Sequence, residues 1–213
     1  MNEVEKLVEA GLVFVNGKRI DSGTMVQQND IVFVKELKGQ QVKEYKYLAY
    51  YKPRNLSTQD LPGRESVITL FKSQGIYPIG RLDKSSEGLL LLTNDGRFAR
   101  EVLNGAHSTD SGQETKWEKE YLVSVKEPLR PGIVKIFESG MDTQVLGKLL
   151  PAKARIVNNS KIQITLQEGK HHQIRVMLDE MGYTINSLKR VRIGDIKIGD
   201  LKPGETRPIS VKF

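Results

Sequence analysis

An acidic and a basic side chain stand two positions apart in the segment PIGRLDKSSEGLLLLTNDG, residues 78–96. Arg81 and Asp83 precede a run of four leucines, which predicts a buried strand that begins just after a polar loop. Gly80 and Gly88 flank the pair and allow backbone or ligand to approach closely. A carboxylate there could act as a nucleophile or as a proton acceptor, provided that it stays ionised in a partly apolar cleft. Asp83 is therefore the first candidate for a catalytic residue.

A permanently charged partner for this carboxylate lies far along the chain. Arg175 falls near the start of an expected helix, HQIRVMLDEMG, and a guanidinium is well suited to keep a carboxylate ionised. Burying such a pair costs desolvation energy, so the pair is better evidence of use than of stability. The sequence alone does not show whether Asp83 and Arg175 meet.

Other catalytic signatures are missing from the sequence. There is no G-x-x-x-x-G-K-[ST] loop, no G-x-G-x-x-G turn and no G-x-S-x-G elbow, so nucleotide hydrolysis, dinucleotide binding and the common hydrolase mechanism lack their motifs. His171 and His172 could suggest a metal site. Neighbouring side chains on a helix diverge by about 100°, however, and no carboxylate or thiol stands at ligand spacing. We therefore expect no bound metal.

The elements that must position these residues are mainly strands. Apolar patterns predict strands over 47–52, on both sides of the loop that carries Asp83, over 119–127, in a hairpin over 153–169 and as short strands over 187–201. Helices are expected over 96–104, 131–140 and 172–182, and a mobile loop over 106–118. We therefore expect an α+β fold with a mixed, largely antiparallel sheet flanked by helices.

The hydrophobic pattern of residues 1–36 predicts a small separate unit. A short helix around VEKLVEAG precedes a hairpin with Asn16 and Gly17 at its turn and a returning strand, DIVFV. So short a segment is too small to bury a core by itself. The polar stretch KELKGQQVKEYK, residues 35–46, suits a linker to a larger domain.

The composition favours an anionic partner. Lysine and arginine together number 33 against 26 acidic residues, for a net charge of +7, which makes nucleic acid the first partner to consider. The absence of cysteine excludes disulfides and thiolate metal sites and fits a cytoplasmic protein. No stretch approaches the roughly 18 consecutive apolar residues of a membrane span, so no membrane partner is expected.

Four segments resemble, in order, the motifs of a known family. GRLDKSSEGLLLLTNDG, KWEKEYLVSV, EGKHHQIRVMLDEMGY and SLKRVRIGDIKIGDLKPGE are similar to the successive motifs of the RsuA-like pseudouridine synthases, which isomerise chosen uridines in ribosomal RNA. The stretch NGKRIDSGTMVQQNDIVFV also resembles the later half of a small RNA-binding module first described in a ribosomal small-subunit protein. We therefore expect a partial module without its front helices over 1–40 and a catalytic domain with the pseudouridine synthase fold over 45–213.

This resemblance implies roles for individual residues. Asp83 would be the catalytic aspartate, Arg81 would help to displace the target base, and Tyr121 would pack against that base. Arg175 would pair with the aspartate, and Ile174 would form part of an apolar floor. The candidates for contacts with RNA phosphates are Lys119, Lys189, Arg190, Arg192 and His172.

The implied reaction breaks the bond from ribose C1′ to the base nitrogen and remakes it to carbon. There is no redox change and no external group is transferred, so we expect no cofactor. The uracil must leave its stack, which requires an aromatic face and cations around it. The carboxylate could attack C1′ or C6, or could take a proton from the sugar, and all three routes require an ionised Asp83.

Two other functions stay open at this point. A non-catalytic RNA-binding assembly factor on the same fold would be indicated by the loss of Asp83, Tyr121 or Arg175, and all three are present. A pseudouridine synthase for transfer RNA is the other alternative, although the front module and the KRVRIG stretch favour the ribosomal branch. The expected partner is ribosomal RNA, with the large subunit slightly favoured, and the expected state is a monomer.

Overall fold

The computed structural model describes residues 3–27, 30–35, 44–60, 62–104, 107–108, 114–115 and 117–211. The chain divides into two compact units, Met1–Glu44 and Tyr45–Phe213. Most of the expected linker over 35–46 and most of the expected mobile loop over 106–118 lie outside the described residues. No helix in the described ranges is long and apolar enough to cross a membrane.

The first unit combines one helix with a small antiparallel sheet. Helix α1 (Glu3–Glu9) precedes strands β1 (Val13–Val15), β2 (Lys18–Arg19) and β3 (Val32–Val34), which lie in the order β2-β1-β3. Asn16 and Gly17 both have positive φ and form the β1–β2 turn, as an Asn-Gly pair predicts. All three residues of β3 are exposed, so little apolar surface is buried in this unit.

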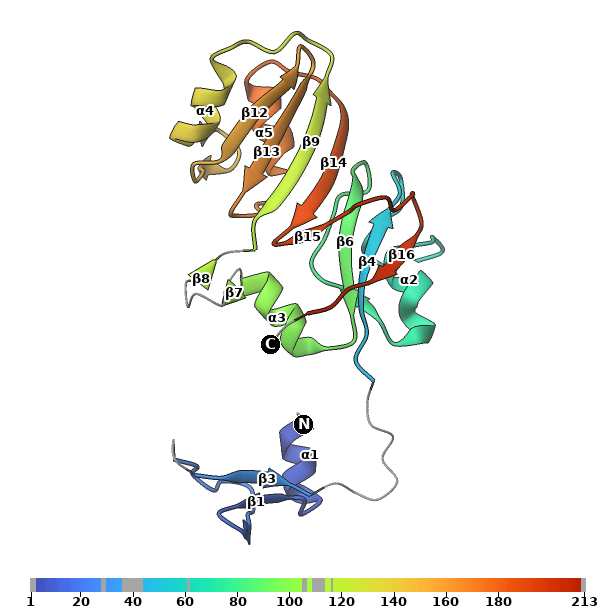
Figure 1. Cartoon of the computed structure of the whole chain (residues 1–213), viewed down its shortest axis with the longest axis vertical. Helices are drawn as coiled ribbons and strands as arrows, with labels where there is room; N and C mark the ends of the chain where they lie inside the picture. Colours follow the sequence, from blue (N-terminus) through green and yellow to red (C-terminus); the bar gives the residue numbers. More distant parts are fainter. Residues whose placement is uncertain are drawn as a thin grey trace. The chain divides into compact units, whose positions relative to one another are not determined.

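A nine-stranded sheet organises the second unit, in the order β12-β13-β9-β14-β6-β4-β16, with β5 paired to β6 and β15 paired to β14 (Figure 1). The longer strands are β4 (Tyr47–Lys52), β6 (Glu87–Thr93), β9 (Lys119–Val125), β12 (Lys153–Asn158), β13 (Lys161–Leu166) and β14 (Ile185–Ile193). The shorter ones are β5 (Tyr77–Pro78), β15 (Ile196–Lys197) and β16 (Thr206–Pro208).

Strands β6 and β14 run parallel, and the other described pairs of this sheet are antiparallel. This confirms the expected mixed, largely antiparallel sheet. The expectation of short strands over 187–201 is confirmed for β15 and wrong for the residues before it, because β14 is a single long strand that pairs with β9 along most of its length.

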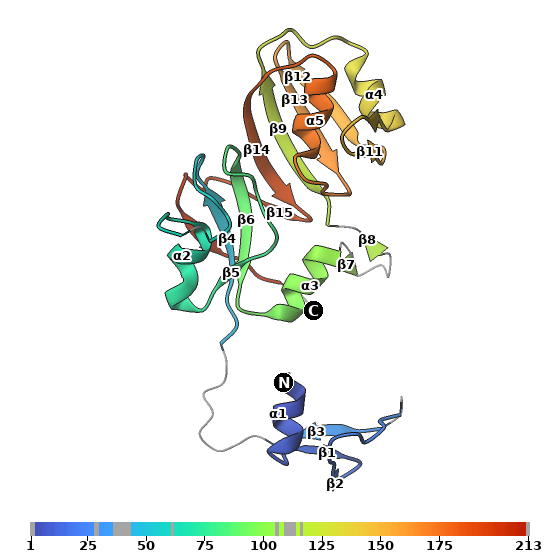
Figure 2. The ribbon, with the colours of Figure 1, turned by 180° about the vertical axis from the view of Figure 1, so that it is seen from behind.

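Helices cover the two halves of the sheet separately. Helices α4 (Ile133–Ser139) and α5 (Gln173–Glu180) pack on β9, β12 and β13, as the view from behind shows (Figure 2). Helix α3 (Gly96–Asn104) and helix α2 (Val67–Phe71), followed by a 3-10 turn over Lys72–Gln74, belong to the half with β4 and β6. Two short hairpins complete the unit, β7 (His107–Ser108) with β8 (Glu114–Thr115) and β10 (Asp142–Thr143) with β11 (Gly147–Lys148).

The four leucines of β6 serve two cores. Leu89 and Leu91 pack on one face of the sheet, and Leu90 and Leu92 pack on the other. All four are fully buried, because successive side chains of a strand point to opposite faces. The apolar run therefore marks a strand covered on both sides.

Gly88 allows β6 and β14 to come together at their parallel joint. This residue pairs with Arg190 and has a φ of +107°. A Cβ on Gly88 would lie 2.8 Å from the Arg190 amide nitrogen and closer still to the Arg190 carbonyl oxygen. Only glycine fits at this joint without movement of the backbone.

Lys52 ends β4 as a fully buried lysine, which the sequence analysis did not single out. Its Nζ donates hydrogen bonds to the carbonyls of Pro53 at 2.9 Å and Leu56 at 2.8 Å. Burial lowers the pKa of Lys52 to about 8, while the negative charge of Asp83 opposes this shift and the charge of Arg190 adds to it. The only signal in the sequence is a lysine that closes an apolar strand immediately before a proline.

Replacing Gly88 with alanine is expected to lower the free energy of unfolding by more than about 2 kcal/mol, because the positive φ and the contact with β14 both oppose a side chain. Urea unfolding followed by circular dichroism measures this loss. The control is Gly96→Ala at the start of α3, where nothing lies within 4 Å of an added Cβ, and its stability should match or slightly exceed that of the wild type. Equal stabilities of Gly88→Ala and the wild type would contradict the proposed joint.

The buried Lys52 should make stability rise with pH in the alkaline range. Its pKa is about 8 in the folded chain and 10.5 for an ordinary lysine, so between these values the unfolded state binds more protons. The free energy of unfolding should therefore gain roughly 2 kcal/mol from this group between pH 7.5 and 9.5. Urea titrations at both pH values test this. The gain in stability should be absent from Lys52→Met. It should be present in the control Lys135→Met, which removes an exposed lysine of α4. If the stability of Lys52→Met rose with pH as steeply as that of the wild type, the role of Lys52 would be refuted.

Candidate active site

Asp83 lies in the loop between β5 and β6. Hydrogen bonds fix the backbone of this loop both before and after Asp83. The Thr58 hydroxyl donates to the Leu82 carbonyl at 2.7 Å and accepts from the Leu82 amide at 3.2 Å. The Ser86 amide donates to the Asp83 carbonyl at 3.0 Å. Leu82 is buried, whereas the Asp83 side chain is 24% exposed. The loop therefore holds the backbone in place and leaves the carboxylate within reach of a ligand.

Two side chains from the start of α5 contact this carboxylate. Arg175 Nε lies 3.5 Å from Asp83 Oδ2, and His172 Nε2 lies 3.4 Å from Asp83 Oδ1. Arg175 Nη2 also donates a hydrogen bond of 2.8 Å to the hydroxyl of Ser86, which is fully buried. The structure thus brings Asp83 and Arg175 together. Ser86 was not among the predicted site residues, and no local feature distinguishes it from the serine before it.

The turn before α5 sets the direction of these two side chains. The helix begins at Gln173, one residue later than predicted, and His172 has a left-handed backbone with a φ of 56°. The buried Gln173 side chain accepts from the Lys170 amide at 3.0 Å and donates to Glu168 Oε1 at 2.9 Å, which ties the turn together. The rings of His171 and His172 stack with their centroids 3.9 Å apart.

The geometric reason given above against a metal at the two histidines is wrong. Because His171 and His172 precede the helix, their rings do not diverge, and one ligand atom from each of them and from Asp83 lies within 4.8 Å of the others. Electrostatics gives a better reason, since cations repel a metal ion at short range. The pocket at this cluster is lined by the positively charged Arg81, Lys119, Lys170, Arg175 and Arg190.

A pocket of about 490 Å³ opens at Asp83, which is within the usual range for small-ligand sites. It is lined from the β5–β6 loop, β9, β14, α3 and α5. Tyr121 of β9 is 9% exposed and contributes both to this lining and to the core under α5. All five residues predicted for catalysis line the pocket, namely Arg81, Asp83, Tyr121, Ile174 and Arg175.

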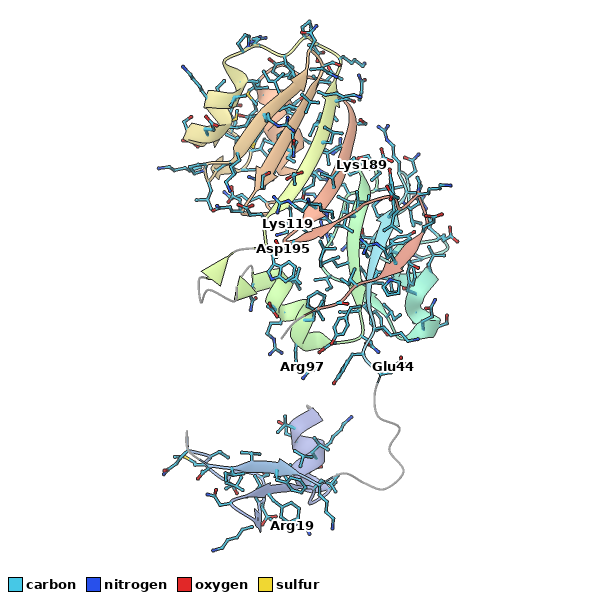
Figure 3. All side chains as sticks on the ribbon, viewed as in Figure 1. Arg19, Glu44, Arg97, Lys119, Lys189 and Asp195 are labelled. Atoms are coloured by element: carbon cyan, nitrogen blue, oxygen red, sulfur yellow. The ribbon has the colours of Figure 1, made fainter. Side chains whose placement is uncertain are left out.

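The lysines predicted to contact phosphates lie on the neighbouring strands β9 and β14 (Figure 3). Lys119, at the start of β9, lines the pocket and donates from Nζ to the Trp117 carbonyl at 3.2 Å. Burial lowers the pKa of Lys119, and the nearby charge of Arg190 lowers it further. Lys189 Nζ lies 4.6 Å from the centroid of the Tyr51 ring, a cation–π distance. Both lysines therefore make contacts within the protein.

The two arginines predicted for the same role also have internal partners. Arg190 is only 4% exposed, and its Nε donates to the Leu89 carbonyl at 2.7 Å across the β6–β14 joint. Arg192 pairs with Glu120 at 3.1 Å and with Glu118 at 3.3 Å. The basic run of β14 thus links strands to each other. Phosphate contacts by these side chains stay a prediction.

Comparisons with known proteins agree with the motifs. A family model described as RNA pseudouridylate synthase matches residues 46–180, and one described as S4 domain matches residues 1–32. The chain is 37% identical over 199 residues to ribosomal large subunit pseudouridine synthase B of Bacillus subtilis, covering 88% of this chain and 78% of that protein. It is 31% identical over 200 residues to the dual-specificity RNA pseudouridine synthase RluF of Escherichia coli, covering 91% of this chain and 65% of that protein.

A solved structure supports the fold. The crystal structure of a pseudouridylate synthase aligns with a TM-score of 0.69 at 24% identity, over 98% of this chain and 89% of that one. The family model alone covers more than half of the 213 residues. The chain therefore belongs to the RNA pseudouridylate synthase family, which confirms its resemblance to the RsuA-like enzymes.

Proposed function

We propose that this protein isomerises a uridine of ribosomal RNA to pseudouridine, with Asp83 as the catalytic carboxylate. One observation carries the proposal, namely a pocket in which Asp83 lies against Arg175 and shares the lining with Tyr121. A relative that is 37% identical is named as a synthase of the ribosomal large subunit, which supports the large-subunit RNA as the substrate.

The pocket contains the groups that this isomerisation needs. A uracil taken out of its stack requires an aromatic or apolar surface, which Tyr121 and Ile174 provide. With the base against these side chains, its sugar lies toward Asp83. Arg81 is exposed two positions before the carboxylate and is placed to help displace the base from the RNA. The bond from C1′ to N1 breaks and a bond from C1′ to C5 forms, so no group is transferred to or from another molecule.

Arg175 orients the carboxylate for any of the three routes. Its Nη2 is held by the buried Ser86, while its Nε is buried and makes no hydrogen bond within the described part of the chain. The 3.5 Å separation between this Nε and Asp83 leaves room for the contact to shorten when substrate binds. Attack on C1′, attack on C6 and removal of a sugar proton all begin from the ionised carboxylate that this guanidinium faces.

Exposed loop cations next to Asp83 are suited to hold the RNA backbone. Arg54 and Lys84 are exposed, and within the described ranges their side chains make no hydrogen bond or ion pair. The Asn55 amide donates to the Lys84 carbonyl at 2.7 Å, which joins the two loops. Such cations would contact phosphates and position the strand without reading its sequence.

Two of the original expectations remain to be tested by other means. The monomeric state stays a prediction, which light scattering coupled to size-exclusion chromatography can test. The cytoplasmic location also stays a prediction.

Mapping of pseudouridine tests the proposed substrate directly. Carbodiimide-dependent stops of reverse transcription are compared in ribosomal RNA from cells with and without the gene. We expect one stop in the large-subunit RNA to disappear without the gene and to return with the wild-type copy. An unchanged map would contradict the proposal and favour a non-catalytic assembly factor, and a stop lost from transfer RNA would identify a different substrate.

The change Asp83→Asn should abolish turnover and leave RNA binding within about threefold, because it keeps the side-chain shape and removes the charge that every route requires. Single-turnover assays measure the rate, and filter binding measures the affinity. The control is Asp200→Asn, an equivalent change at an exposed position. Asp83→Asn with wild-type turnover would refute the role of the carboxylate.

A further inference from the structure

His172 is a second titratable side chain in contact with Asp83, and the roles discussed so far do not use it for chemistry. Its Nε2 lies 3.4 Å from Asp83 Oδ1, whereas Arg175 contacts the other carboxylate oxygen, Oδ2. We propose that His172 is the general base that removes the proton from C5 of the uracil. This inference rests on the proposed function and names the residue for a step that Asp83 alone leaves unassigned.

The reaction requires such a base. When C1′ bonds to C5, that carbon carries both the new bond and its original hydrogen. The ring regains its conjugation when the C5–H bond breaks, its electron pair stays with the ring, and the proton passes to the unprotonated ring nitrogen of the His172 imidazole. N1, which has lost its bond to C1′, takes a proton from water, and His172 releases the proton that it holds to water. One C–N bond and one C–H bond are thus replaced by one C–C bond and one N–H bond.

The position of His172 suits this step in all three routes. If Asp83 acts on the sugar, C5 must approach the C1′ that lies beside the carboxylate. If Asp83 attacks C6 instead, C5 is the adjacent ring atom. In each case the proton leaves within a few ångströms of Asp83, where the imidazole of His172 is placed.

Imidazole is also the most suitable group in the pocket for accepting a proton. Besides the imidazoles of His171 and His172, the ionisable side chains in the lining are guanidinium, ammonium and phenol groups and the Asp83 carboxylate. A neutral imidazole has a ring nitrogen that can accept a proton, whereas guanidinium and ammonium groups have no acceptor atom. Because the His172 side chain is 46% exposed, it can exchange its proton with water after each turnover.

The backbone at His172 supports a functional role. A φ of 56° is uncommon for a residue other than glycine, and such conformations cluster at active sites. The ring has little freedom, because it stacks on His171 and because the Gln173 side chain ties the turn. Asp83 is the charged group that its ring contacts, and Arg175 of α5 contacts the other oxygen of that carboxylate.

The test compares His172→Asn with Asp179→Asn, which introduces the same residue at an exposed position of α5, outside the pocket lining. Asparagine tolerates a left-handed backbone, so the turn should be retained. Single-turnover rates are measured on RNA whose target uridine carries hydrogen or deuterium at C5. For His172→Asn we expect a rate that is lower by roughly a hundredfold or more and a primary deuterium isotope effect that is larger than that of the wild type. The rate of Asp179→Asn should stay within about threefold of the wild type, with an unchanged isotope effect.

A structural role predicts a different result. A loss of rate in His172→Asn without a larger isotope effect would overturn the inference, and so would a wild-type rate. Thermal melts followed by circular dichroism check that each variant is folded. Added imidazole should restore part of the rate of His172→Ala. If imidazole restored none of this rate, the result would count against a proton-transfer role. A wild-type protein that forms no pseudouridine would refute the proposed function itself, whereas an active wild type with an unaffected His172→Asn refutes only this inference.

Discussion

The carboxylate of Asp83 is the group on which the site depends. Arg175 and His172 reach its two oxygens from one turn of chain, and the buried hydroxyl of Ser86 holds the far side of the guanidinium. Removing charges from water costs several kcal/mol per ion even after relaxation. This arrangement is therefore a poor way to stabilise a fold and a good way to keep a reactive group in one orientation at a pocket of ligand size.

The parallel joint of β6 and β14 determines where that carboxylate lies. The half of the sheet with β9 and α5 supplies Tyr121 and Arg175, and the half with β4 and β6 supplies the loop of Asp83. Apolar packing also crosses this joint, because Leu82 of the Asp83 loop packs in the core under α5 and Ile193 of β14 packs in a core with β6. Gly88 permits the close approach of the two strands, and Arg190 crosses the joint with its hydrogen bond to β6.

Short-range patterns predicted most of the elements, because turns, caps and alternation are local properties. The turn at Asn16 and Gly17 and the alternating burial of β9 are examples. Strand β14 was expected in pieces because basic residues interrupt its apolar pattern, and pairing with β9 extends it. The contacts of the site were less predictable. The hydrogen bond from Arg175 to Ser86 spans 89 positions, and no local rule indicates it. Likewise, the burial of Lys52 depends on the strands around it.

The positive charge of the chain is distributed differently from what its basic runs suggest. A net charge of +7 indicates an anionic partner, and the run in β14 was the expected phosphate-binding face. In the structure, Arg190 instead binds a carbonyl of β6, and Arg192 binds two carboxylates at the start of β9. A strand paired on both sides gives long basic side chains such partners close by, whereas loop residues such as Arg54 and Lys84 keep their charge toward solvent. Attraction to a polyanion therefore has to come mainly from loop cations, because only charges that reach phosphates displace counterions.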